Sequence, residues 1–288
     1  MTRRAAEKNN DRLFCWEQVS ATNRLFRVSR VFAPRSCVDK LLPLYALFSA
    51  VEQVCSTIAD EDVASSKLNY WRSELLHQDR ADSQHPLVKE LCRTGASGDL
   101  KRESIAALLD AATSRLSVNA PPDQKALKEI CVELYRPQLE MELDVCGLPD
   151  AVPVFSRDLL ARNGMTQLFR ESTHRKEEGG FWWVPLNLLA RHSISREEIV
   201  RNPRSAGAVQ LLRDVLADDT FAGSDALESS STRVVDYSSA RHVFAISGLY
   251  SRKLRLIKDF SADSCAAELE RVGPADLLDA WKSARKAG

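Results

Sequence analysis

The sequence predicts an all-α protein that folds as a single domain of roughly ten helices. Apolar residues recur at steps of three and four along most of the 288-residue chain, and no segment alternates apolar with polar side chains as a strand would. Glycine and proline number only 11 each, so few residues would interrupt a long helix. There is no internal repeat and no long linker, and the hydrophobic fraction of 44% is too high for a disordered chain.

In the first half of the chain, helices are predicted wherever this apolar period is unbroken. The predicted helices cover residues 37–58, 65–76, a short segment that begins at Pro86, 105–116 and 123–146. Proline is favoured in the first turn of a helix, which places a helix start at Pro86. Asp123 is a suitable N-cap for the last of these helices. Gly147 fits its end, because glycine is the residue most often found just after a helix C-terminus.

The second half is also predicted to be helical, with two interruptions. Helices are expected over residues 155–169, 195–201, 206–217, 232–258 and 274–286. The sequence EEGG at 177–180 breaks the helical pattern, and the aromatic segment FWWVP at 181–185 follows as a new start. Residues 220–231 are rich in serine and glycine and are predicted to form a loop.

Charge and cysteine usage exclude several classes of protein. The 40 basic residues balance the 40 acidic ones, whereas a dedicated nucleic-acid-binding protein usually carries a net basic field. The seven cysteines form no CxxC pair, which predicts buried thiols in a reducing compartment and no zinc site. The longest charge-free apolar stretch, residues 41–51, is too short to cross a bilayer, so no transmembrane segment is expected.

We interpret residues 1–19 as an N-terminal basic extension and residues 20–288 as the helical domain. Seven lysine or arginine residues stand against three acidic residues in the first 30 positions. Two interpretations of this composition stay open, namely an organelle presequence diluted by the acidic residues, or a solvated helix face.

Three segments of the chain carry a resemblance to a known family. They are FAPR at 32–35 with LYALF at 44–48 and KLNYWRSEL at 67–75, then the helix that ends with CG at 146–147, and then FRE at 169–171 with GFWWVP at 180–185. In this order they resemble the squalene/phytoene synthase family, from about residue 20 to about residue 260. The resemblance implies an isoprenoid-synthase-like helical bundle.

The chemistry of that family requires two DxxxD motifs on facing helices. Their carboxylates hold Mg²⁺, which binds and activates the diphosphate of the substrate. Matched to this sequence, the first motif falls on Glu52, Gln53 and Ser56, and the second runs from Glu171 to Arg175. Only Glu52 and Glu171 keep a carboxylate, and Arg175 places a permanent cation where a metal ligand belongs. We therefore predict that both motifs are degenerate, with no catalytic residues, no metal and no cofactor.

The central helix also departs from the family pattern. Where the family has small residues that leave room for prenyl chains, this chain reads LYRPQL at 134–139. Proline inside a helix removes a backbone hydrogen bond, so we expect a kink at Pro137. The channel should be narrowed, or polar where an isoprenoid would lie.

The first functional hypothesis is a catalytically inactive protein that acts by binding. The degenerate pattern resembles one branch of the family in particular, the mitochondrial complex I assembly factor with a phytoene-synthase-like fold. This resemblance implies a location in the mitochondrial matrix or on the matrix face of the inner membrane, and protein subunits of respiratory complex I or of the mitoribosome as partners. RNA contact inside a ribonucleoprotein particle and peripheral membrane association stay open. The expected contact residues are Arg136, His174, Arg175 and Lys176.

Two alternatives belong to other functional classes. One is an active Mg²⁺-dependent head-to-head prenyl transferase, for which the candidate carboxylates are Glu52, Glu171, Asp214 and Asp218. The other is a binding protein for an isoprenoid or a lipid, which would use what is left of the cavity.

Overall fold

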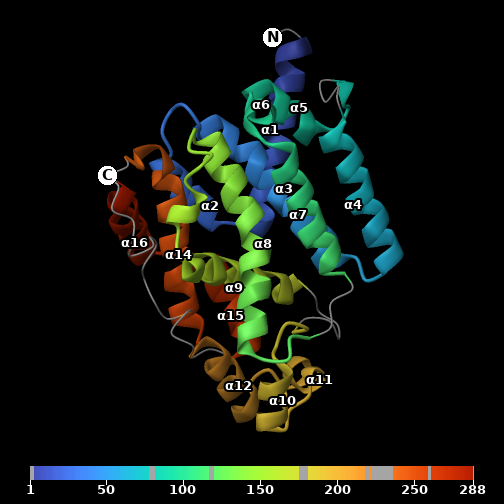
Figure 1. The fold of residues 1–288 in the computed structure, drawn as a ribbon, viewed down its shortest axis with the longest axis vertical. Helices are drawn as coiled ribbons and strands as arrows, with labels where there is room; N and C mark the ends of the chain where they lie inside the picture. The colour runs from blue at the N-terminus through green and yellow to red at the C-terminus, as the bar shows by residue number, and fades with distance from the viewer. Residues whose placement is uncertain are drawn as a thin grey trace.

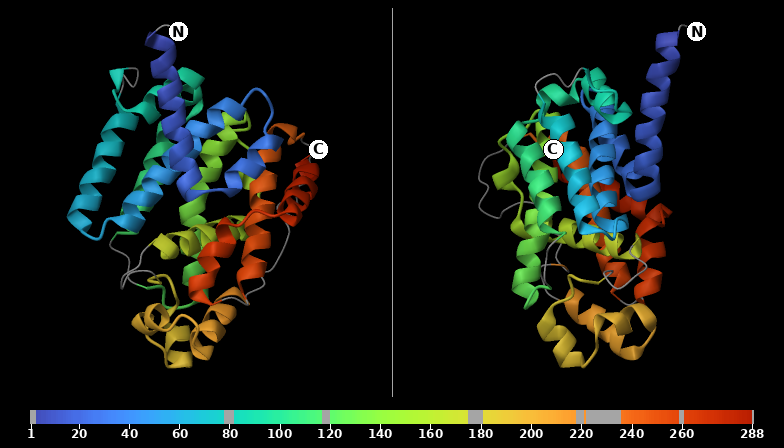
Figure 2. Two further views of the ribbon diagram at one scale, coloured as in Figure 1. Left: turned by 180° about the vertical axis from the view of Figure 1, so that it is seen from behind. Right: turned by 90° about the vertical axis from the view of Figure 1, so that its right-hand side faces the viewer.

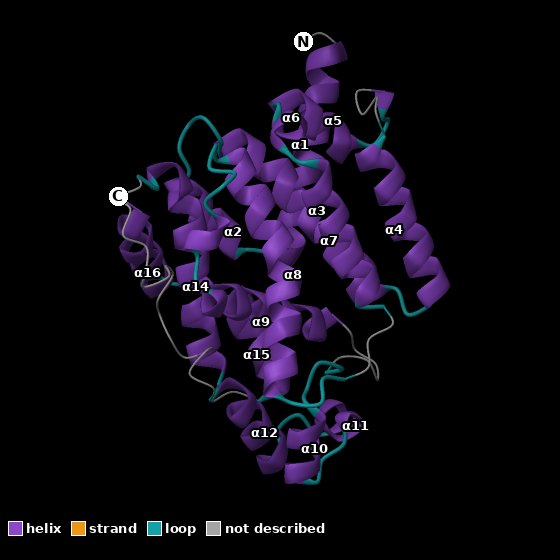
Figure 3. Cartoon of the chain, in the orientation of Figure 1, coloured by secondary structure: helices purple, strands orange, loops and turns teal. Residues whose placement is uncertain are grey.

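The three- and four-residue apolar period of the sequence produces a bundle of packed α-helices (Figures 1 and 3). The computed structural model describes residues 3–77, 82–116, 120–174, 181–217, 221, 236–258 and 261–287. These residues contain helices and no strand, which confirms the all-α prediction. None of the described helices is long and apolar enough to span a membrane.

The first half of the chain supplies most of one end of the bundle. Its helices are α1 (Arg3–Thr22), α2 (Leu25–Ser29), α3 (Val38–Thr57), α4 (Glu61–Leu76), α5 (Pro86–Thr94), α6 (Ala96–Asp99), α7 (Arg102–Ser114) and α8 (Gln124–Val145). The predicted ends of α8 are confirmed. The Asp123 carboxylate accepts the Ala126 backbone N–H at 2.8 Å, and Gly147 adopts φ +75°, which favours glycine.

The second half completes the bundle and forms its opposite end. Its helices are α9 (Arg157–His174), α10 (Leu186–His192), α11 (Arg196–Arg201), α12 (Ala206–Leu216), α14 (Arg241–Ile257), α15 (Ala262–Glu270) and α16 (Pro274–Ala284). Helices α10 to α12 lie at the end away from the N-terminus in all three views (Figures 1 and 2). The predicted breaks at 177–180 and 220–231 lie outside the described residues, apart from Phe221.

Two features of the sequence-based prediction need correction. The described residues contain fifteen α-helices rather than roughly ten, because the apolar period does not identify short helices such as α2 and α6. The helix expected from residue 232 begins at Arg241. The Asp236 carboxylate accepts both the backbone N–H and the hydroxyl of Ser238, which favours a turn over a helix at that point.

Buried apolar side chains form two clusters that meet along α3 and α8. One cluster contains α1, α3, α4, α5 and α7, and the other contains α9, α12 and α14. Helix α8 contributes to both, with Met141 and Val145 in the first and Leu139 and Leu143 in the second. The central helix is therefore buried on more than one side, and several of its polar residues, such as Gln138 and Glu142, lie in the interior.

Helices α8 and α9 approach most closely at Gly164. A Cβ atom at this position would overlap the backbone of Cys131 on α8. Glycine is needed here because the two backbones are in contact, although its φ angle is not in the left-handed region. This contact fixes the spacing of the two helices that carry most of the central polar residues.

We expect Gly164→Ala to destabilise the fold by about 1–3 kcal/mol, because an extra methyl group between packed backbones must push the helices apart. Chemical denaturation followed by circular dichroism measures this loss. Gly98→Ala is the matched control, since a Cβ at Gly98 would meet no atom within 4 Å and alanine favours the helix. Equal stability of the two variants would contradict the close approach.

Candidate functional site

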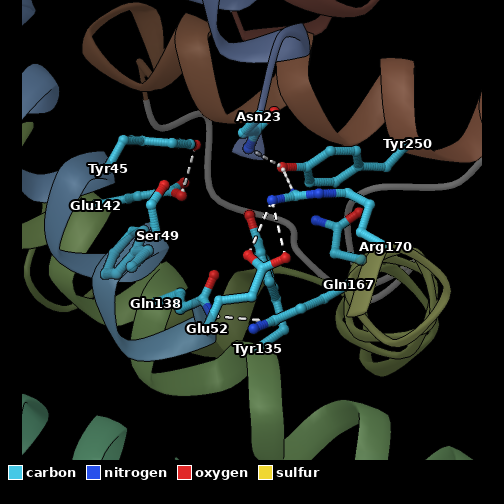
Figure 4. Close-up of a pocket in the computed structure, with 12 residues that line it drawn as sticks. Asn23, Tyr45, Ser49, Glu52, Tyr135, Gln138, Glu142, Gln167, Arg170 and Tyr250 are labelled. Atoms are coloured by element: carbon cyan, nitrogen blue, oxygen red, sulfur yellow. Dashed lines mark hydrogen bonds and ion pairs between the residues drawn. The ribbon is translucent and has the colours of Figure 1, made fainter. Parts of the chain in front are cut away.

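A layer of polar side chains crosses the centre of the bundle where the two hydrophobic clusters meet. It is built by α3, α8, α9 and α14, with Asn23 added from the segment after α1 (Figure 4). The cavity that it encloses measures about 10 Å³, close to the smallest volume that admits one water molecule. The space at this layer is therefore narrow, and its lining is mostly polar. The lining residues are Asn23, Tyr45, Phe48, Ser49, Glu52, Tyr135, Gln138, Glu142, Asn163, Gln167, Arg170 and Tyr250.

Three of these helices contribute polar side chains with a common spacing. They are Tyr45, Ser49 and Glu52 on α3, Tyr135, Gln138 and Glu142 on α8, and Asn163, Gln167 and Arg170 on α9. In each set the members stand at i, i+3 or i+4, and i+7, so they lie on one face of their helix. Figure 4 shows the three faces converging on one point. The layer is thus a joint product of the helical period and the way the helices pack.

Glu52, at the first motif position, is held by Arg170 from α9. Arg170 Nη2 donates to both carboxylate oxygens, at 2.8 and 3.2 Å, and both side chains are buried. Burial raises the pKa of Glu52 to about 7, and the Arg170 guanidinium acts in the opposite direction. The pair replaces the hydration that each charge would have in water, because a guanidinium and a carboxylate match each other's hydrogen-bonding geometry.

Glu171, at the second motif position, is held by a different arginine. Arg115 lies just after the end of α7, and its Nη1 atom donates to Glu171 Oε1. Both side chains are buried, at 5% and 3% exposure. Since Arg170 and Glu171 are neighbours on α9, the two pairs form one cluster, and Glu270 of α15 joins it through an ion pair with Arg170 (Nε to Oε1, 3.8 Å).

A third buried carboxylate, Glu142, belongs to a neutral network. The Tyr45 hydroxyl donates to Glu142 Oε1 at 2.7 Å, and His242 Nε2 lies 3.0 Å from the same hydroxyl oxygen. Burial raises the pKa of Glu142 to about 8, while hydrogen bonds from Tyr45 and Tyr135 act to lower it. Burial also lowers the pKa of His242 to about 4. At neutral pH the network therefore favours a protonated glutamate and a neutral histidine.

Amide and hydroxyl groups close the layer around these charges. Gln138 Nε2 donates to Gln167 Oε1 at 2.9 Å and joins α8 to α9. Asn23 Nδ2 donates to the Tyr250 hydroxyl at 2.8 Å, and that hydroxyl also lies 3.5 Å from Arg170 Nη1. These bonds tie four segments together, so opening the centre would break several buried hydrogen bonds at once.

The residues present do not fit a magnesium site. Mg²⁺ needs several oxygen ligands in octahedral arrangement. Here Glu52 and Glu171 each face a guanidinium, which competes for the lone pairs that a metal would use and repels a cation. Across the described part of the chain, no three histidine, cysteine or acidic side chains come together as a group that could hold a metal ion.

The other residues that the sequence singled out either do not line the cavity or lie outside the described part of the chain. Ser56 is buried and Gln53 is half-buried on α3. Arg136 is exposed on α8, away from the cavity. His174 is the last residue of α9, and its side chain is outside the described part of the structure, as are Arg175 and Lys176.

Of the two further carboxylates that the transferase alternative names, Asp214 lies apart from the layer. Asp214, on α12, does not line the central cavity; its Oδ2 atom lies 2.9 Å from His192 Nε2, and its Oδ1 atom accepts from Gln210. Asp218 lies outside the described residues.

Sequence analysis did not identify several residues of the site, among them Arg115, Glu142, Tyr250 and His242. The signal for Glu142 was present, since it stands seven residues after Tyr135 on the face that also carries Gln138. The pairing of Arg115 with Glu171 spans 56 positions, and no local pattern indicates such a partner.

Comparison with known proteins gives a family and a fold. A family model described as squalene/phytoene synthase matches residues 19–273. No match was found among curated proteins.

Two solved structures resemble this chain over nearly its full length. A dehydrosqualene synthase crystallised in complex with a ligand is 13% identical, with a TM-score of 0.65, over 98% of this chain and 97% of the other. The squalene synthase HpnC from Alicyclobacillus acidocaldarius is 17% identical, with a TM-score of 0.55, over 92% of this chain and 95% of the other. At such identities the likeness establishes the fold alone.

We expect Arg170→Met to destabilise the protein by about 3–5 kcal/mol, because it leaves the Glu52 carboxylate buried without its partner. The double variant Glu52→Leu with Arg170→Met should lose less than the sum of the two single losses. Urea denaturation of the four proteins gives the coupling energy. Additive losses would show that the two side chains do not depend on each other.

Glu142 should make the protein less stable as the pH rises from 6.5 to 8. Its folded pKa of about 8 lies above the ordinary value of 4.5, so the folded state binds the extra proton and stability is lost as that proton leaves. His242, whose pKa is lowered from 6.5 to about 4, adds stability as the pH rises from about 4 to about 7.5, so it offsets a small part of the loss at the lower end of this range. We expect the wild type to lose about 1–2 kcal/mol more than Glu142→Gln over this range, because Glu52, with a pKa of about 7, titrates in both proteins. Glu133→Gln, exposed on the same helix, is the control and should keep the loss; the same loss in Glu142→Gln would exclude Glu142 as its source.

Proposed function

Because this chain belongs to the squalene/phytoene synthase family, we propose that it is a non-catalytic member that keeps the fold and acts by binding other macromolecules. One observation carries the proposal, namely that Glu52 and Glu171 are each held by a buried arginine. A carboxylate engaged in this way is not available to a divalent cation unless the arginine moves, and its movement would leave a buried charge unpaired.

The volume of the centre supports the same proposal. Pockets that bind small organic ligands usually measure about 300–1,000 Å³. The central cavity measures about 10 Å³ and is lined mainly by polar side chains. An isoprenoid chain would have to displace the hydrogen-bonded layer, so the alternative of an isoprenoid-binding protein also lacks the space that it needs at this site.

We further propose that the protein assists the assembly of a large mitochondrial complex, in the matrix or on the matrix face of the inner membrane. Support comes from the resemblance to the degenerate branch of the family and from the basic composition of the first 30 residues. The expected partners are protein subunits of respiratory complex I or of the mitoribosome. Arg136 is the described candidate contact, because it is exposed on the central helix and can reach a partner.

The competing function is a Mg²⁺-dependent prenyl transferase. Family membership and the full-length likeness to squalene and dehydrosqualene synthases favour it. For this activity Glu52 and Glu171 would have to release their arginines and face open space. The two functions therefore differ in whether substrate and metal can open the centre.

We expect no turnover of farnesyl or geranylgeranyl diphosphate in the presence of Mg²⁺. We also expect Mg²⁺ with diphosphate to leave the melting temperature unchanged, because a ligand stabilises a protein only if it binds the folded state. Product analysis and a thermal melt measure the two effects, with an active squalene synthase as the positive control. Formation of a head-to-head product, or a rise of several degrees, would favour the transferase.

Binding to an assembly is tested separately by sedimentation of a mitochondrial extract that contains the tagged protein. We expect co-migration with subunits of complex I or of the mitoribosome, and a loss of co-migration in Arg136→Glu. Lys125→Glu changes an exposed charge on the same helix and should leave co-migration intact. A protein that sediments alone under all conditions would contradict the assembly role.

A further inference from the structure

Helix α16 presents an apolar ridge to the outside of the molecule. It lies on the outer edge of the bundle against α14 (Figure 1). Asp276, Ala280 and Ala284 face inward and are buried. Leu277 and Leu278 are 50% exposed, and Trp281 is 46% exposed, on the opposite side of the helix. Three large apolar side chains gathered on one exposed helix face favour an interaction surface.

Basic side chains surround this ridge. Lys282, Arg285 and Lys286 follow it on α16 and its last turn, and Arg255 is exposed on the neighbouring α14. The Arg285 guanidinium lies 4.8 Å from the centre of the Trp281 ring. As far as the described residues go, none of these four cations takes part in an ion pair.

The acidic side chains of α16 do not offset this charge. Asp276 accepts from Arg252 and Lys253 of α14, and Asp279 accepts from Arg252. These ion pairs use up the local carboxylates inside the interface between the two helices. A basic surface is therefore left although the formal net charge of the whole chain is zero.

A cavity of about 220 Å³ lies between α9, α14 and α16 beside the ridge. Its apolar lining includes Leu159 and Phe244. Its polar lining includes the guanidinium side chain of Arg162, which is only 2% exposed. One carboxylate, Asp279, also lines the cavity and is paired with Arg252 at 3.2 Å. The remaining polar lining is Ser247, Ser251, Arg255, Lys282, Ser283 and Lys286. Hydroxyl groups and cations above an apolar wall suit a phosphate that is attached to a hydrocarbon.

We propose that the face formed by α16 and the end of α14 docks on the surface of a membrane that contains anionic phospholipids. Helix α16 lies in the plane of the interface, with Leu277, Leu278 and Trp281 among the headgroups and upper acyl chains. Lys282, Arg285, Lys286 and Arg255 face the lipid phosphates, and one headgroup occupies the mouth of the cavity. This docking surface is distinct from the central polar layer and does not depend on whether the protein is an enzyme.

The test is co-sedimentation of the full chain with vesicles. We expect binding to vesicles that contain phosphatidylglycerol or cardiolipin, and little binding to pure phosphatidylcholine. Lys282→Glu with Lys286→Glu should weaken binding at least tenfold, because each basic residue near an anionic surface adds roughly a fivefold affinity. Leu277→Ala with Trp281→Ala should weaken binding by a similar factor, because it removes most of the inserted apolar area.

Matched controls lie on α4, on the other side of the molecule (Figure 1). Val63→Ala with Tyr70→Ala removes side chains that are 48% and 46% exposed and should leave binding unchanged. Lys67→Glu with Lys125→Glu reverses two exposed charges elsewhere and should reduce binding less than twofold. Circular dichroism melts of all variants establish that each is folded.

Four outcomes would overturn the proposal. One is equal binding to anionic and neutral vesicles, and another is equal loss of binding in the α16 and α4 variants. The third is release of the protein by millimolar inorganic phosphate but not by chloride of the same ionic strength, which would identify a site for a soluble anion. If no vesicle binds and sedimentation shows a dimer that Trp281→Ala dissociates, the ridge is instead an interface between two copies.

Discussion

The pairing of buried carboxylates with buried arginines is the constraint on which the centre of this protein depends. Four charges from α3, α7 and α9 are taken out of water, and the loss of hydration is tolerable only while each cation contacts an anion. This requirement fixes the positions of Glu52, Arg170, Glu171 and Arg115 relative to one another. It also holds three helices in register, since moving any one of them would separate a pair. A site that binds metal needs the reverse, namely carboxylates that are close together and open to a cation.

The surrounding side chains make the arrangement difficult to reverse. The Gln138–Gln167 bond and the contacts of Tyr250 with Asn23 and Arg170 surround the charges in a layer whose cavity measures only about 10 Å³. A substrate that entered would have to break these bonds before it made any new ones. Part of its binding free energy would be used for that rearrangement. The apparent affinity would therefore fall in proportion to the fraction of protein molecules in the open state. Family membership therefore supplies the scaffold, and the closed polar layer at its centre is the basis of our proposal that this member acts by binding.

Much of the fold and part of the site could be predicted from the sequence, and the limit has a physical cause. The helical repeat of apolar residues and the capping residues are local features of the sequence, so α3, α8 and α16 were predicted to within a few residues. The bulky segment at 134–139 likewise indicated a filled channel. Pairing is not local. Arg170 and Glu52 are 118 positions apart, and only the packing of α9 on α3 brings them into contact. The sequence showed that carboxylates were missing from the motif positions, but it could not show that the two remaining ones were already neutralised.

The charge on the surface of the molecule shows the same limit of prediction from sequence. A formal net charge of zero argues against a protein with a basic field on every side, but the net charge does not show where the individual charges lie. In this fold many of the acidic side chains are placed against cations in interfaces between helices, as Asp276 is against Arg252 and Lys253. The cations without such a partner near α16 then face solvent beside an apolar ridge. The ion pairs between helices thus also determine which surface is left basic, because the carboxylates that they engage do not offset the cations that remain beside α16.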